Sequence, residues 1–256
     1  MGKSNQWKSG SAFPIPNRAM AFGDGLFETM IFDGEKIRFF EFHVDRLRKG
    51  MKLLHLDLSQ LNPDVILSFI NSTEPQRIKW TVFRAGAGKY SPHTGQINQV
   101  LQIAPFKKKS EISLQAVISR EVFLVPSMIS QCKTLNSLPY VLAALEREKR
   151  GANEIILLDH KGNVSEAGAS NIFWSIGEEI FTPSLQAGCI EGVSRKVILQ
   201  ELNDNGFKVK EGLFKVDQLR QADRVWISNA TGITYLKSIE ETVYSDDPVP
   251  LIENLF

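Results

Sequence analysis

Cysteine is scarce in this sequence of 256 residues, and so is any excess of charge of one sign. The two cysteines, Cys132 and Cys189, are too few for a disulfide framework and lack the spacing of metal ligands, so we expect a reducing compartment and no metal site. A net charge of +1 provides no field that attracts nucleic acid or anionic lipid. Residues 1–10 are polar, and no apolar run approaches the roughly 20 residues of a membrane helix. We therefore expect a cytoplasmic protein that binds neither nucleic acid nor membrane.

The composition, with 43% hydrophobic and 23% charged residues, is that of an ordinary globular protein. In the first half, residues 27–32 and 36–40 flank Asp33-Gly34 in the pattern of a β-hairpin. Apolar residues spaced by 3, 4 and 3 then predict a helix that begins near Glu41; they are Val44, Leu47, Met51 and Leu54. A second helix is predicted at about residues 63–71, with strands at 77–84 and 96–104.

A short basic segment that opens with proline, residues 105–110, suits a linker between domains. Beyond it, strands are predicted at 111–119, 154–158, 170–175, 179–182, 224–228 and 234–239. Helices are predicted at 137–149, from Gly192 to a stop at Asn205-Gly206, and at 216–220. The pattern indicates an α+β chain with an N-terminal domain of residues 1–104 and a C-terminal domain of residues 111–256.

One motif covers some thirty residues of the second half. Glu166 is followed by Asn171-Ile172-Phe173, by Ile180-Phe181-Thr182 and by Gly192-Val193-Ser194-Arg195. This order resembles the signature of the class IV aminotransferases, which are enzymes of fold type IV that depend on pyridoxal 5′-phosphate (PLP). The resemblance implies an α/β fold with a small N-terminal α/β domain, a larger β-rich C-terminal domain, and PLP between them.

The same residues suit the polar groups of PLP. An anion near the ring nitrogen keeps it protonated and makes the cofactor an electron sink, and Glu166 supplies a carboxylate after a strand. The phosphate needs converging amide donors, which the start of a helix at Gly192, Val193 and Ser194 offers. Taken alone, those three residues indicate only an ordinary helix start.

The segment Cys132-Lys133-Thr134-Leu135-Asn136 resembles the Lys-x-Leu-Asn pattern of aminodeoxychorismate lyases and D-amino acid aminotransferases. The resemblance implies that Lys133 forms the Schiff base with PLP. A free lysine has a pKa near 10.4, and burial or a nearby cation lowers it and frees the amine for imine chemistry.

Three further segments resemble the family. The Arg-x-x-x-Phe-Gly-Asp-Gly-x-Phe-Glu-Thr pattern at residues 18–29 implies that Phe27 lines the substrate pocket. The segment His43-Val44-Asp45-Arg46-Leu47 implies that Arg46 binds the phosphate, since its planar guanidinium group can donate hydrogen bonds to two oxygens at once. The turn of residues 228–232 implies a second phosphate contact, made by Asn229, Ala230 and Thr231.

Residues 84–92 resemble the glycine-rich Arg-Gly-x-Gly-Gly-Arg-Gly-Tyr loop of the lyases. Arg84 ends an alternating apolar row, so it is either capped by a buried partner or aimed at a ligand. Lys89 stands where the family often has an arginine that meets substrate carboxylates, although lysine cannot make the bidentate contact. On the resemblance, Phe27, Arg84 and Lys89 are the candidate substrate-binding residues.

The resemblance implies a homodimer that acts at the amino-bearing carbon of a small carboxylate. Lys133 removes the proton there, and Glu166 supports the electron sink. Branched-chain aminotransferases usually carry a tyrosine five residues after the lysine, where this chain has Leu138. This difference, with the lysine segment and the glycine-rich loop, favours aminodeoxychorismate lyase, which releases pyruvate to give 4-aminobenzoate. The alternative is a 2-oxoglutarate-dependent aminotransferase for branched-chain or D-amino acids. A binding protein without catalysis would require the loss of Lys133 or Glu166, and both are present.

Overall fold

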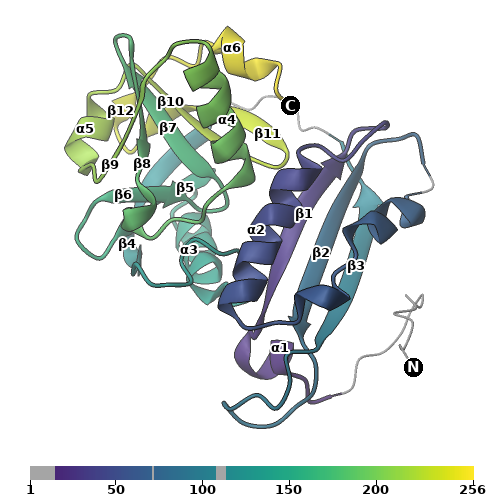
Figure 1. Cartoon of the computed structure of the whole chain (residues 1–256). Helices are drawn as coiled ribbons and strands as arrows, with labels where there is room; N and C mark the ends of the chain where they lie inside the picture. Colours follow the sequence, from purple (N-terminus) through teal and green to yellow (C-terminus); the bar gives the residue numbers. More distant parts are fainter. Residues whose placement is uncertain (1–14, 71, 108–113) are drawn as a thin grey trace.

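The computed structural model describes residues 15–70, 72–107 and 114–256, which form two β-sheets with helices on their faces (Figure 1). The smaller sheet contains three antiparallel strands in the order β1-β2-β3. Their bounds are Gly25–Phe32, Gln76–Arg84 and Ile97–Pro105. Helix α1 (Arg18–Phe22) precedes this sheet, and α2 (Phe40–Leu53) covers one face of it.

The apolar face of α2 packs on the smaller sheet. Val44, Leu47 and Met51 are buried together with Trp80 of β2, as the spacing of the helical stripe predicts. Gly50 allows the close approach, because a Cβ at this position would lie 2.8 Å from the side chain of Leu26 on β1. The predicted α2 helix is therefore confirmed. Because its apolar face packs on the smaller sheet, the residues on its opposite face point away from that sheet.

The larger sheet contains nine strands in the order β6-β5-β4-β11-β10-β7-β8-β9, with β12 paired to β11. The bounds of β4 to β8 are Leu114–Leu124, Glu154–Asp159, Val164–Ala167, Asn171–Ile176 and Glu179–Pro183. Those of β9 to β12 are Val209–Gly212, Arg224–Asn229, Gly232–Ile239 and Thr242–Val243. Aromatic side chains fill its core, with Phe173 and Trp226 stacked at a centroid distance of 5.7 Å.

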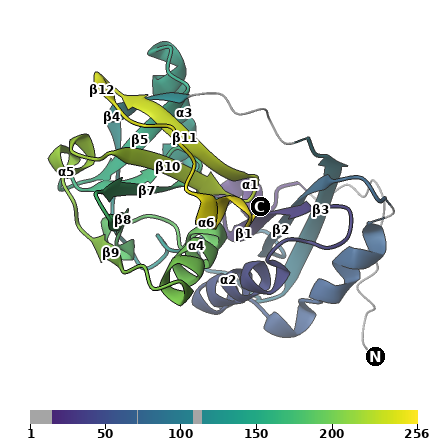
Figure 2. The ribbon, with the colours of Figure 1, turned by 90° about the horizontal axis from the view of Figure 1, so that it is seen from above.

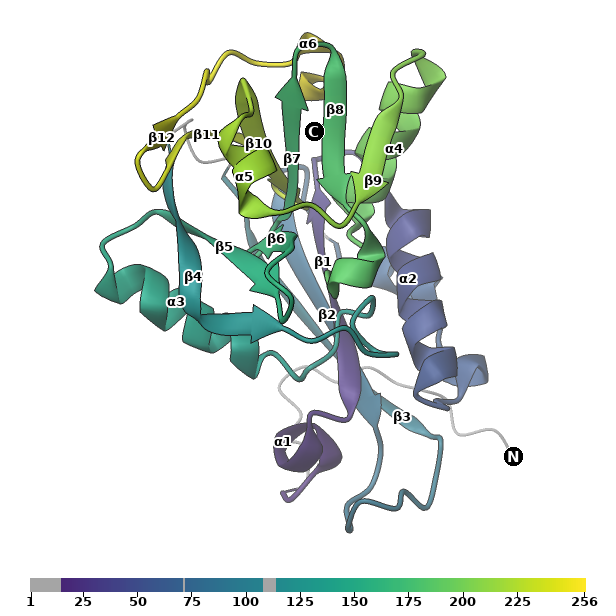
Figure 3. The same ribbon diagram turned by 90° about the vertical axis from the view of Figure 1, so that its left-hand side faces the viewer.

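Helices pack against different parts of the larger sheet. Helix α3 (Leu138–Lys149) lies along β4 and β5 (Figure 3), and α4 (Val193–Asp204) packs beside α2 (Figure 2). The remaining helical segments are α5 (Val216–Arg220), α6 (Pro250–Glu253) and the 3₁₀ turns Leu58–Gln60, Pro63–Phe69 and Leu185–Ala187. In the described residues, no helix is long and apolar enough to cross a membrane.

The predicted hairpin at residues 27–40 is wrong in its second half. Only Ile37 forms an isolated bridge to Phe32, because Phe39 takes a left-handed conformation (φ 53°) and α2 begins at Phe40. The partner of β1 is instead β2, some fifty residues later. The helix predicted at residues 63–71 is a 3₁₀ helix, Pro63–Phe69.

The strand predicted at residues 111–119 is β4, which extends to Leu124; residues 111–113 lie outside the described part of the chain. The predicted linker lies partly outside it as well. Pro105 is the last residue of β3, and residues 108–110 are not among those described. The division into two domains and the boundary between them therefore stay predictions.

Candidate active site

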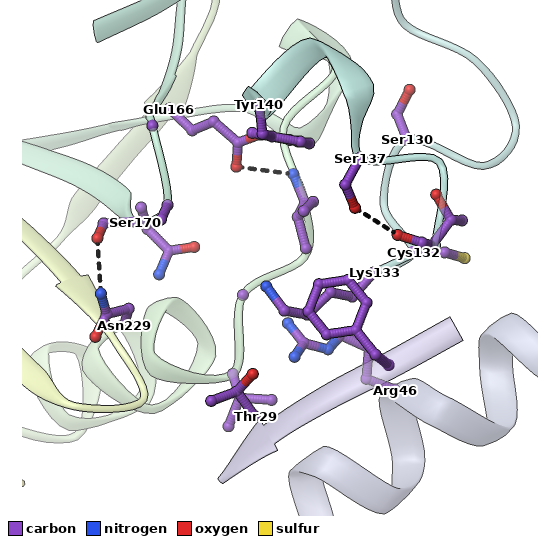
Figure 4. A pocket seen from close by; sticks show the side chains of 18 of the residues that line it. Thr29, Arg46, Ser130, Cys132, Lys133, Ser137, Tyr140, Glu166, Ser170 and Asn229 are labelled. Carbon is purple, nitrogen blue, oxygen red and sulfur yellow. Dashed lines mark hydrogen bonds between the residues drawn. The ribbon is translucent and has the colours of Figure 1, made fainter. Parts of the chain in front are cut away.

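A cavity of about 650 Å³ lies where the two sheets meet, and both contribute to its wall (Figure 4). It gathers ten of the twelve predicted site residues: Phe27, Arg46, Lys133, Glu166, Gly192, Val193, Ser194, Asn229, Ala230 and Thr231. Arg84 and Lys89 do not line it.

Lys133 is positioned by the loop that precedes α3. The amide of Phe27 donates to the carbonyl of Lys133 at 2.9 Å, which attaches this loop to β1. Nζ of Lys133 lies 4.7 Å from the centroid of the Phe27 ring. The protein atoms around this amine, and then the charge of Arg46, lower the pKa of Lys133 to about 8. About a tenth of the amine is therefore neutral, and hence nucleophilic, at pH 7, far more than for an ordinary lysine.

Glu166 is a buried carboxyl group on β6, with a relative exposure of 4%. Its Oε1 accepts a hydrogen bond from the hydroxyl group of Tyr140 at 2.5 Å, and its Oε2 accepts one from the amide of Ile190 at 3.2 Å. Burial raises the pKa of Glu166 to about 7, although both hydrogen bonds oppose the rise. Tyr140 was not predicted from the sequence, since nothing in the local pattern of α3 distinguishes it from a core aromatic residue.

The start of α4 opens into the cavity. No side chain caps this helix, so its first amides have no partner from a side chain. A Cβ at Gly192 would lie 1.9 Å from Oδ1 of Asn171, so only glycine fits beside that amide. Nδ2 of Asn171 donates to Oγ of Ser194 and to the carbonyl of Ser228, both at 2.8 Å. Asn171 thus ties α4 to the end of β10, a role that its place in the motif did not reveal.

The turn after β10 forms the wall beside α4. Oδ1 of Asn229 accepts a hydrogen bond from the amide of Thr231 at 2.8 Å, and Nδ2 of Asn229 donates to Oγ of Ser170 at 2.9 Å. The turn is therefore held in one shape by its own side chain. Together with α4 it places backbone amides and hydroxyl groups along one end of the cavity, which suits an anion.

Arg46 reaches the cavity from α2, but Glu28 holds most of its guanidinium group. Glu28 is 1% exposed, and it accepts from Nε and Nη2 of Arg46 and bonds Nδ1 of His43. Burial alone would raise the pKa of Glu28, but Arg46 and His43 lower it to about 2. Nη1 of Arg46 donates to the carbonyl of Glu191 at 3.1 Å. Since a guanidinium group has five donors, two remain for a ligand.

Of the two alternatives for Arg84, a buried partner or a ligand, the structure shows the partner. Arg84 is 6% exposed at the end of the apolar row of β2, and its Nε donates to Oδ2 of Asp24 at 2.9 Å. Its Nη2 donates to Oδ1 of Asp24 at 3.4 Å, and its Nη atoms also bond carbonyl groups, including that of Thr94 at 3.1 Å. The carbonyl of Lys89 accepts a hydrogen bond from Arg18 at 2.7 Å, and the Lys89 side chain lies outside the cavity of its own chain. A substrate role for Arg84 and Lys89 stays a prediction.

The cavity fits PLP on three structural observations. It contains an amine with a lowered pKa, a buried carboxyl group, and a helix start with no side-chain cap next to a glycine that a Cβ would block. These features match the aldehyde, the ring nitrogen and the phosphate of the cofactor.

Comparison with known proteins agrees with this arrangement. A family model described as amino-transferase class IV matches residues 25–239. Aminodeoxychorismate lyase of Vibrio harveyi is 26% identical over 226 residues, which cover 85% of this chain and 83% of that protein. D-alanine aminotransferase of Bacillus licheniformis is 27% identical over 258 residues, with coverages of 97% and 90%.

Two solved structures show the same fold. Branched-chain aminotransferase of Thermoproteus uzoniensis has a TM-score of 0.87 at 21% identity, covering 96% of this chain and 89% of that chain. The 4-amino-4-deoxychorismate lyase of Pseudomonas aeruginosa has a TM-score of 0.81 at 22% identity, with coverages of 95% and 93%. At these identities the likeness concerns the fold alone.

Proposed function

The chain belongs to the class IV aminotransferase family of PLP-dependent enzymes, and from that membership we propose that it is an aminodeoxychorismate lyase. The reaction eliminates pyruvate from its substrate and leaves 4-aminobenzoate. Membership confirms the predicted family and cofactor, and the fold agrees with the predicted α/β class.

The segment after Lys133 supports the lyase most directly. Leu138 occupies the place of the tyrosine that branched-chain aminotransferases usually carry, and its side chain is 65% exposed and does not line the cavity. The cavity wall therefore lacks a hydroxyl group from that position. A second support is similarity, since the lyase of Bacillus subtilis is 38% identical over 92 residues, 36% of this chain.

Each of the chain's own residues has a distinct role in this proposal. PLP, when bound, supplies an electron sink for the carbon that carries the substrate amine. Lys133 holds the cofactor and, once released, takes the proton from that carbon with an amine whose pKa is already lowered. Glu166 holds the proton on the ring nitrogen. The amides of α4, the turn at Asn229–Thr231 and the two remaining donors of Arg46 hold the phosphate.

The second candidate is an aminotransferase for branched-chain or D-amino acids that uses 2-oxoglutarate. The similarity to D-alanine aminotransferase over 97% of this chain favours it. Both candidates use the same amine and carboxyl group, so they differ only in the steps after the proton is removed.

We further propose that the chain forms a homodimer and that its substrate is a small amino carboxylate. The exposed face of α3 supports an association, because several large apolar side chains lie on it at exposures of 48–65%: Leu138, Val141, Leu142 and Leu145. A monomer rarely leaves such a row facing water.

One pair of assays tests the proposed reaction. Purified enzyme is supplied with aminodeoxychorismate and no keto acid, and separately with L- and D-amino acids plus 2-oxoglutarate. A lyase releases pyruvate without an acceptor, because elimination returns Lys133 to its starting state. Turnover that appears only with amino acids and an acceptor would replace the lyase by the aminotransferase.

A further inference from the structure

We propose that Tyr140 is a positioning residue: its hydroxyl group keeps the carboxylate of Glu166 charged and oriented to accept a hydrogen bond from the protonated ring nitrogen of the cofactor. The inference rests on the proposed role of Glu166 and deepens it. The side chains of Tyr140 and Glu166 project toward each other and are in contact (Figure 4).

The two oxygens of Glu166 are held from different parts of the fold. The hydroxyl group of Tyr140, on the first turn of α3, lies 2.5 Å from Oε1, while the amide of Ile190, in the segment before α4, lies 3.2 Å from Oε2. Each carboxylate oxygen has two acceptor positions, so one on each remains. Tyr140 and Glu166 both line the cavity, and the carboxylate can therefore receive a third donor from there while its plane stays fixed.

The proton of this hydrogen bond stays on the tyrosine. Burial, and then the charge of Glu166, raise the pKa of Tyr140 well above its ordinary value, so the hydroxyl group donates throughout the working pH range. Burial favours the neutral form of Glu166, and the hydrogen bond from Tyr140 is the largest influence that opposes it. The amide of Ile190 and the more distant charges of Lys133 and Arg46 act in the same direction.

Loss of the hydroxyl group would therefore shift Glu166 toward its neutral form. A neutral carboxyl group offers less negative charge to the protonated ring nitrogen, which weakens the electron sink. Tyr140 also belongs to the same stretch of chain as Lys133, seven residues earlier. One segment thus carries both the proposed attachment point, Lys133, and the residue that positions Glu166.

The test is Tyr140→Phe in the PLP-loaded enzyme, which removes the hydroxyl group and leaves the ring. Tyr235→Phe is the matched control, because Tyr235 also donates to a carboxyl group, Oε1 of Glu253 at 2.9 Å, but does not line the cavity. The measurements are the cofactor absorbance as a function of pH, the affinity for PLP, and kcat and KM.

Removing a hydrogen bond to a charged group disfavours its charged form by about tenfold or more. We expect Tyr140→Phe to weaken PLP binding by about this factor, to move the pH midpoint of the absorbance, and to lower kcat with little change in KM. Tyr235→Phe should match the wild type in all of these. If Tyr140→Phe also matches the wild type, the positioning role is overturned while the proposed function stands. If the wild type gives no cofactor band with excess PLP, the proposed roles of Lys133 and Glu166 are overturned instead.

Discussion

Glu28 binds the guanidinium group of Arg46 through two hydrogen bonds, with Oε1 2.8 Å from Nε and Oε2 2.5 Å from Nη2. Glu28 is buried, Arg46 lines the cavity, and His43 adds a third contact to the same carboxylate. Arg46 therefore has two separate tasks. It neutralises a buried carboxylate on β1, and we propose that its remaining donors contact the phosphate of the cofactor.

These two tasks predict two effects of Arg46→Ala. Leaving Glu28 buried without the guanidinium group, and with His43 as its remaining contact, should lower the free energy of unfolding by roughly 3–5 kcal/mol. Losing a charge-assisted contact should weaken PLP binding by roughly 1–3 kcal/mol. Adding Glu28→Gln should recover much of the stability and none of the affinity, as measured by urea unfolding and PLP titration. Recovery of PLP affinity in the double variant would contradict the phosphate contact.

Glu166→Gln should change how the stability of the cofactor-free enzyme depends on pH. The pKa of Glu166 is about 7 in the folded chain, against 4.5 as its reference value. The folded state therefore binds the extra proton, and the stability that this contributes is fully present below pH 4.5 and lost as the pH rises through 7. Between pH 4.5 and 8 the variant should gain roughly 3 kcal/mol relative to the wild type. Urea unfolding gives the free energies. If the difference between the variant and the wild type is the same at pH 4.5 and at pH 8, the pKa of Glu166 is not raised by its environment.

The lowered pKa of Lys133 predicts the pH dependence of cofactor attachment. Because only the neutral amine attacks an aldehyde, the rate of PLP incorporation into the cofactor-free enzyme should rise with pH and level off above about 8. Stopped-flow absorbance gives this rate. A rate that keeps rising toward pH 10 would mean that Lys133 titrates like an exposed lysine.

Gly192→Ala should weaken cofactor binding by moving Asn171. The added Cβ would lie 1.9 Å from Oδ1 of Asn171, which holds Ser194 and the end of β10 in place. Gly151→Ala serves as the control, since no other side chain lies within 4 Å of its Cβ position although its φ of 65° makes alanine unfavourable. Both variants should lose some stability, but only Gly192→Ala should bind PLP less tightly in equilibrium titration.

The sequence predicts the fold and the cavity residues well where one local pattern determines the outcome. The apolar stripe of α2 and the glycine at the start of α4 have a physical meaning within a few neighbouring residues. The failures come from distant partners. The strand that pairs with β1 lies some fifty residues away, so a nearby turn misleadingly suggests a hairpin. Glu28 and Tyr140 matter only through the residues they contact, Arg46 and Glu166, and those contacts require the folded chain.

The attachment of PLP to Lys133 is the central claim, and borohydride reduction with peptide mapping tests it most directly. Reduction of the PLP-loaded enzyme should leave one pyridoxyl group per chain, on the peptide that contains Lys133. Lys79 is the built-in alternative, because its Nζ lies 4.9 Å from the centroid of the same Phe27 ring that Lys133 contacts. A pyridoxyl group on Lys79, or none on any lysine with excess PLP present, would contradict the claim.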